Sequence, residues 1–200
     1  MPTTRIITDV PQDQVNFVLS MISFDGGTAQ QEPEDDGQVT IIATFPDKPN
    51  ASIAKLAAAA PEAGWMKAAR AELGVAEDPS GSNPRIEAYH GTTEGGAADD
   101  AVPWCASFVN FCVEATGVRG TRSKAARSWM TWGVDAADFV PGCIVVLKRG
   151  SAPKGHVGFF AGFEAGRIKL LGGNQGNQVG VTSFDVGGVL ARRLAPPPNT

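Results

Sequence analysis

Three cysteines can act as thiol nucleophiles in this chain of 200 residues, and two histidines can take up a thiol proton near neutral pH. Cys105 follows Pro103 and opens a run in which apolar residues recur at three- and four-residue steps, a pattern typical of a helix. Pro103 suits a first helical turn. We therefore expect Cys105 at a helix start, where free backbone N–H groups and the helix dipole favour a thiolate.

His156 is the candidate base for this thiol. It begins one strand of a predicted hairpin that turns at Ala165. In that register Asn174 lies opposite His156 on the same face of the sheet, with Cβ atoms roughly 5 Å apart. A thiol, an imidazole and an amide are the nucleophile, base and orienting group of papain-like hydrolases. If a bulge shifts the register by one residue, Gln175 becomes the next candidate for the orienting group.

The remaining cysteines and histidine favour structural roles. Cys112 lies one heptad after Cys105 and points inward, and Cys143 starts a buried strand. His90 lies on a short predicted helix, where a packing or surface role is more common than catalysis. The cysteines lack the C-x-x-C spacing of paired metal ligands. We expect no disulfide framework, no metal site and no cofactor.

The hydrophobic pattern divides the chain into two parts. Residues 1–48 predict a small α+β module, in which the polar segment 30–37 is expected to be an exposed turn. Residues 49–60 read as a linker. Residues 61–196 place helices first and a meander of strands afterwards, which predicts an α+β fold with an antiparallel sheet.

Composition argues against several classes of partner. The net charge is −4 and no basic stripe is present, so nucleic acid is not an expected partner. No apolar run approaches the ~20 residues that span a bilayer. The N-terminus lacks the apolar core of a signal peptide. We therefore expect synthesis in the cytoplasm, with the place of action a separate question.

Four short motifs in a fixed order resemble a known family. They are PWCA at 103–106, PG at 141–142, GHVGF at 155–159 and GGNQ at 172–175. Together they resemble the CHAP and NlpC-type papain-like peptidoglycan hydrolases, above all the compact phage- and prophage-associated group. The resemblance covers roughly residues 65–194. It implies a papain-like core of helices packed on an antiparallel sheet, and the catalytic residues Cys105, His156 and Asn174.

The resemblance also implies a substrate and a place of action. Such enzymes cleave amide bonds in peptidoglycan stem peptides, so the expected activity is that of a peptidoglycan endopeptidase or an N-acetylmuramoyl-L-alanine amidase. A phage or prophage endolysin is one kind of enzyme with this activity. The resemblance implies action at the cell wall, after release or delivery by another system. Many CHAP members have Glu where this chain has Gly172, which leaves Asn174 as the orienting group.

Three residues near the motifs are candidates for substrate binding. Trp104 adjoins the nucleophile and can be a wall of the cleft or part of the core. Asp100 can cap the following helix or contact an amino or guanidino group of a substrate, and Gln175 follows the orienting amide. The glycines 172–173 can form a tight turn or let a substrate backbone approach closely.

Two other classes of function remain open at this stage. A related thiol enzyme could transfer an acyl group or cut another amide, as a secreted antibacterial effector amidase would. A binding module on an inactive enzyme scaffold is the third class, and an intact Cys105, His156 and Asn174 argue against it. The sequence leaves the bond cleaved, the type of peptidoglycan, the delivery route, the role of residues 1–48 and the oligomeric state open.

Overall fold

The computed structural model describes residues 3–10, 12, 15–24, 27–35, 37–45, 63–136, 139–164 and 166–196. The chain divides into two compact units, Met1–Pro61 and Glu62–Thr200. The linker expected at 49–60 lies outside the described residues.

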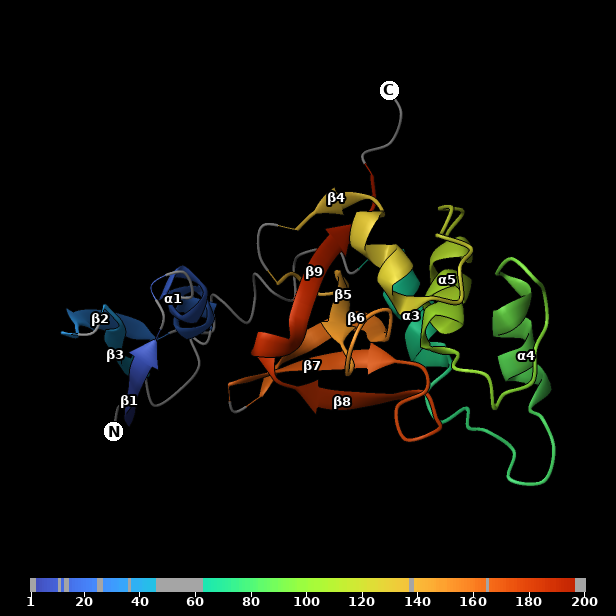
Figure 1. The fold of residues 1–200 in the computed structure, drawn as a ribbon, viewed down its shortest axis with the longest axis horizontal. Coiled ribbons are helices and arrows are strands. Elements are labelled where there is room, and N and C mark those ends of the chain that lie inside the picture. Colours follow the sequence, from blue (N-terminus) through green and yellow to red (C-terminus); the bar gives the residue numbers. More distant parts are fainter. Residues whose placement is uncertain are drawn as a thin grey trace. The chain divides into compact units, whose positions relative to one another are not determined.

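The first unit contains a three-stranded antiparallel sheet and a helix (Figure 1). Its elements are β1 (Thr3–Val10), α1 (Val15–Phe24), β2 (Thr28–Pro33) and β3 (Val39–Phe45), with strand order β1-β3-β2. Buried Val15 and Ile22 of α1 pack with Ile41 and Ala43 of β3. The prediction of an exposed turn at 30–37 is wrong for residues 30–33, because they belong to β2. Among the described residues this strand pairs with β3 alone and forms one edge of the sheet, so polar side chains suit it.

The second unit begins with helices that lie beside the larger sheet (Figure 1). They are α3 (Gly64–Ala71), α4 (Pro84–Gly91), α5 (Cys105–Glu114) and the 3₁₀ helix η2 (Ala126–Thr131). Asn83 starts α4 by accepting a hydrogen bond from the backbone N–H of Arg85, with Pro84 in the first turn. Helix α5 packs against α3, α4 and the strands β6 and β7.

The larger sheet has six strands in the order β4-β9-β5-β6-β7-β8, and its paired strands are antiparallel. The predicted meander is present as β5 (Ile144–Lys148), β6 (Gly155–Glu164), β7 (Arg167–Gly172) and β8 (Gly180–Phe184). A short 3₁₀ helix, η3 (Val186–Gly188), leads to β9 (Val189–Leu194), which returns to pair with β5, and β4 (Val134–Asp135) adds the far edge. The α+β fold with helices packed on an antiparallel sheet is therefore confirmed.

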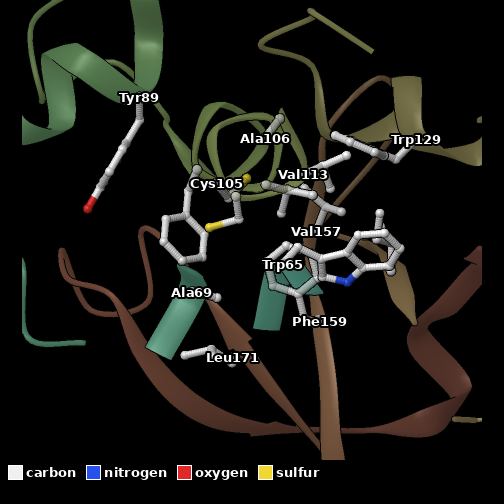
Figure 2. Packing of buried hydrophobic residues seen from close by; sticks show 14 of the residues in the cluster. Trp65, Ala69, Tyr89, Cys105, Ala106, Val113, Trp129, Val157, Phe159 and Leu171 are labelled. Atoms are coloured by element: carbon white, nitrogen blue, oxygen red, sulfur yellow. The ribbon is translucent and has the colours of Figure 1, made fainter. Parts of the chain in front are cut away.

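One buried cluster joins the helices to the sheet. Cys105, Val157 and Phe159 belong to it, together with Trp65 and Tyr89 (Figure 2). All but two residues of α5 are buried. A helix with so much buried surface is held by packing on its neighbours rather than by intrinsic propensity. Its first residue is consequently fixed in position against β6.

A buried carboxylate ties α4 to the end of α3. Glu72 accepts hydrogen bonds from the guanidinium of Arg85 and from the hydroxyl of Tyr89. The hydrogen bond from Arg85 is the main cause that lowers the pKa of Glu72, although burial opposes it. Tyr89 in turn packs edge-on against Phe108 of α5, with ring centroids 5.5 Å apart. This network sets the position of α5 from the side opposite the sheet.

Candidate active site

Cys105 is the first residue of α5, as its sequence context predicts, but the cap differs from the expected one. The N-cap position belongs to Trp104 and has no side-chain hydrogen bond, and Pro103 precedes the helix. The Cys105 side chain is 7% exposed. It lines a cavity of about 520 Å³, whose other walls include Pro103, Asn174 and Arg149.

His156 is the second residue of β6 and pairs with Leu147 of β5. It is 4% exposed, and its ring packs against Phe184 with centroids 5.3 Å apart. Within the described part of the chain, its buried Nε2 atom has no hydrogen-bond partner. The residue lines a second cavity of about 330 Å³ together with Asn174 and Gln175. An unpartnered imidazole nitrogen in a cleft can take up or release a proton.

The backbone brings the thiol and the imidazole to neighbouring positions. Helix α5 packs on β6, and the backbone N–H of Val157, the residue after His156, hydrogen-bonds to the Cys105 sulfur. The two cavities that these side chains line have Arg149 and Asn174 in common. Cys105 and His156 therefore line adjoining cavities.

The expectation that the helix start makes Cys105 a thiolate is wrong for the free protein. Burial raises the pKa of the Cys105 thiol, and this outweighs the hydrogen bonds from the backbone N–H groups of Val157 and Ala106, which lower it. Burial, followed by the positive charge of Arg149, lowers the pKa of His156 to about 4. At neutral pH the pair is thus a thiol beside a neutral imidazole.

Asn174 lies in the loop after β7, at a left-handed φ of +55° that asparagine tolerates better than most residues. A turn centred on Ala165 predicts which residues of β6 and β7 pair. That prediction is wrong next to the turn, because Glu164 pairs with Arg167. An irregularity between Phe160 and Gly162 restores the expected register closer to His156. Asn174 lines both cavities, but no hydrogen bond joins it to His156 among the described residues.

Gln175, the alternative orienting group, is 8% exposed and folds back onto β7. Its Nε2 atom donates to the carbonyl of Leu170 at 3.3 Å, and its buried Oε1 atom has no partner in the described part of the chain. A Cβ atom at Gly172 would lie 2.4 Å from that Nε2 atom. Gly172 therefore makes room for the Gln175 amide, and Gln175 lines the cavity of His156.

The other two residues expected to bind substrate are held by their own chain. Trp104 is fully buried, and its indole N–H donates to Glu77 at 2.9 Å. Asp100 is 3% exposed and accepts hydrogen bonds from the backbone N–H groups of Asp78 and Asn83, rather than capping α5. Both positions favour a structural role and line neither cavity.

The remaining cysteines and the second histidine lie in the interior. Cys112 and Cys143 are fully buried, and burial raises the pKa of Cys112. His90 is also fully buried, with its Nδ1 atom 2.9 Å from the hydroxyl of Ser107. Among the described residues no group of three or more His, Cys, Asp and Glu side chains could hold a metal ion, and no helix is long and apolar enough to cross a membrane.

Sequence reasoning missed Arg149, which lines both cavities and whose charge affects both Cys105 and His156. It follows β5 directly, and β5 pairs with the start of β6. The pairing of these two strands, once predicted, was the signal that could have placed a residue just beyond β5 near His156.

One comparison with known proteins agrees with the resemblance to the CHAP family. Residues 97–174 match the family model of the CHAP domain. No curated protein matches the chain. The chain is also similar to the crystal structure of an NlpC/P60 family protein from Bacillus cereus ATCC 10987, with 12% sequence identity and a TM-score of 0.43. The alignment covers 84% of this chain and 51% of that one, so this chain spans about half its length.

The family match contains all three expected catalytic positions, from Cys105 through His156 to Asn174. The resemblance to CHAP domains is therefore confirmed for residues 97–174. This family supports a cysteine amidase or peptidase of the peptidoglycan-hydrolase type.

Proposed function

We propose that this CHAP domain hydrolyses an amide bond in the stem peptides of peptidoglycan, with Cys105 as the nucleophile and His156 as the general base. One observation carries the proposal. A thiol at a helix start and an unpartnered imidazole line adjoining cavities that share Arg149 and Asn174. A scissile amide bound across that shared border is within reach of both groups.

The reaction starts from the neutral pair. The His156 imidazole removes the thiol proton as the Cys105 sulfur attacks the amide carbonyl, which gives a tetrahedral oxyanion and an imidazolium. The backbone N–H groups at the start of α5 donate to that oxyanion. The imidazolium then protonates the leaving amine as the carbon–nitrogen bond breaks, which leaves a thioester on Cys105. Water, deprotonated by the same imidazole, hydrolyses the thioester and restores the thiol.

Asn174 is the proposed orienting residue. Its amide lines the cavity of His156, and an amide oxygen that accepts from one ring N–H leaves the other nitrogen free for the thiol. The pair begins uncharged, so the imidazolium forms only during the reaction. An orienting amide is most useful at that stage, when the ring carries a proton on both nitrogens.

We assign the whole of this chemistry to the second unit, since every group in the proposed site lies within Glu62–Thr200. Residues 1–48 are proposed as a targeting or assembly module. We propose the cell wall as the place of action because stem peptides are found there, reached after release or delivery by another system. A protein that starts near residue 61 should keep its activity on soluble stem-peptide fragments.

Digestion of purified peptidoglycan tests the proposal. The intact protein should release fragments whose new amino and carboxyl termini, identified by mass spectrometry, define the bond that is cut. Cys105→Ala should abolish release, and Cys112→Ala, a buried control with the same change of side chain, should retain it. Equal release by Cys105→Ala and the intact protein would refute the thiol mechanism, and no release of peptide termini by the intact protein would refute the substrate.

A further inference from the structure

Among the residues that the structure describes, Arg149 is a cation without a partner, and it lines both cavities of the proposed site. It follows the last residue of β5, is exposed, and lines both the cavity of Cys105 and that of His156. Within the described residues its guanidinium makes no hydrogen bond or ion pair. Other cations of the unit do have acidic partners, as Arg85 does with Glu72.

Positive charge gathers around the cavity of Cys105, although the whole chain carries a net charge of −4. Its lining includes Arg149, Lys154 and Lys124, and one acidic residue, Glu77. Glu77 accepts the indole N–H of Trp104, and Lys124 donates to the carbonyl of Gly96 at 2.9 Å. Arg149 and Lys154 are thus the two cations of this lining whose side chains make no bond to the described part of the chain.

The charge of Arg149 disfavours a protonated His156 in the free protein, although it also lowers the pKa of the Cys105 thiol. After burial, the charge of Arg149 is the second cause that lowers the pKa of His156. The same charge disfavours the imidazolium that the proposed mechanism forms. A substrate group of negative charge beside Arg149 would cancel this effect when it binds, and would let the base take its proton.

We infer that Arg149 forms a subsite for a carboxylate that the substrate carries next to the scissile amide. This inference rests on the proposed function and specifies its substrate class: stem peptides with a free carboxylate beside the cleaved bond, in preference to the same peptides with that carboxylate amidated. The planar guanidinium can donate two parallel hydrogen bonds to a carboxylate, which a primary amide cannot accept in the same way.

Two small alkylating reagents test the subsite without any peptidoglycan. Iodoacetate and iodoacetamide react alike, since the thiolate sulfur displaces iodide from a methylene carbon, but one carries a carboxylate and the other an amide. We define the preference as the rate of Cys105 alkylation by iodoacetate divided by the rate by iodoacetamide, measured by mass spectrometry of the Cys105 peptide. Dividing again by the same ratio for free cysteine removes the intrinsic difference between the reagents.

Arg149→Gln should lower this normalised preference by about twofold to fivefold, the effect of one charge pair that is partly open to water. Arg149→Lys should retain part of it, because the charge remains but the two parallel hydrogen bonds are lost. Arg119→Gln removes the same charge from an exposed residue that lines neither cavity, and should leave the preference unchanged. An unchanged preference in Arg149→Gln, or an equal loss in Arg119→Gln, would overturn the inference.

The second measurement uses paired stem-peptide fragments that differ only in whether the carboxylate beside the scissile amide is free or amidated. The intact protein should cleave the free form with a kcat/KM about twofold to fivefold higher, and Arg149→Gln should bring the two forms close to equal. Cleavage of both forms without preference would refute the subsite and leave the proposed function standing. Cleavage of neither form, with the reagent preference intact, would refute the proposed function and leave an anion site beside Cys105.

Discussion

Gly173 offers a test of how the loop with Asn174 is held. A Cβ atom at Gly173 would lie 2.5 and 2.6 Å from two carbons of the Trp104 ring and 2.7 Å from the Cβ atom of Phe108. Both side chains are fully buried, and the indole is fixed by its hydrogen bond to Glu77. Neither neighbour can move away without breaking other contacts. The glycine therefore lets the loop with Asn174 pack directly on the start of α5.

Gly173→Ala should consequently destabilise the second unit. Overpacking of a core costs about 1–3 kcal/mol, and two buried obstacles at such distances place this change near 3 kcal/mol. At about 2–4 °C per kcal/mol, the melting temperature should fall by roughly 6–12 °C. Gly91→Ala is the matched control, because a Cβ atom there meets nothing within 4 Å and Ala is favoured inside α4.

Tryptophan fluorescence during urea unfolding measures this effect in the full chain. The protein has four tryptophans, and all of them lie in Glu62–Thr200, so the signal follows that unit alone. Gly173→Ala should shift the midpoint to lower urea, and Gly91→Ala should leave it equal or higher. A Gly173→Ala protein as stable as the original, but without activity, would contradict the packing argument and favour the alternative that this glycine lets a substrate approach.

Three further predictions concern the catalytic groups. His156 has a pKa of about 4 when folded and 6.5 as its ordinary value, so below pH 6.5 the unfolded chain binds a proton that the folded protein does not. The free energy of unfolding should fall by about 3 kcal/mol as the pH drops from 6.5 to 4, and His156→Gln should flatten that part of a pH series of urea unfolding curves. Because burial raises the pKa of Cys105, the rate of its alkylation by iodoacetamide should increase with pH, and the midpoint of that increase should lie at a higher pH than for free cysteine. A rate that is already constant between pH 6 and 7 would instead indicate a preformed ion pair. Asn174→Gly keeps the left-handed backbone and should lower kcat without abolishing it. Asn174→Asp should raise the pKa of His156 and move the acidic limb of the pH–rate profile to higher pH. Loss of all activity in Asn174→Gly, or an unmoved limb in Asn174→Asp, would remove Asn174 from the orienting role.

Local patterns predict much of the second unit. The strands β5 to β7 are apolar runs bounded by turn residues, and their hairpin pairings follow from short connections. The start of α5 at Cys105 follows from its apolar periodicity and the preceding proline. The order of the four motifs places the cysteine before the histidine and the amide, and all three of these residues lie within the range that matches the CHAP domain.

The features that the sequence did not reveal depend on distant contacts. Strand β2 is polar and becomes a strand only because β3 offers it an edge. A helix start favours a thiolate at Cys105, but the degree of burial, which reverses the effect, depends on how β6 packs against α5. The place of Arg149 between the two cavities depends on the pairing of β5 with β6 and on the loop that holds Asn174.

The central claim is that Cys105 forms a thioester with the acyl part of a stem peptide. Rapid acid quenching during turnover of a stem-peptide fragment, followed by digestion and mass spectrometry, tests it directly. We predict that the peptide containing Cys105 gains the mass of the acyl fragment, that the adduct disappears with hydroxylamine, and that Cys105→Ala shows none. Product release with no acyl adduct at any turnover time, or an adduct on Cys112 or Cys143 instead, would contradict the account.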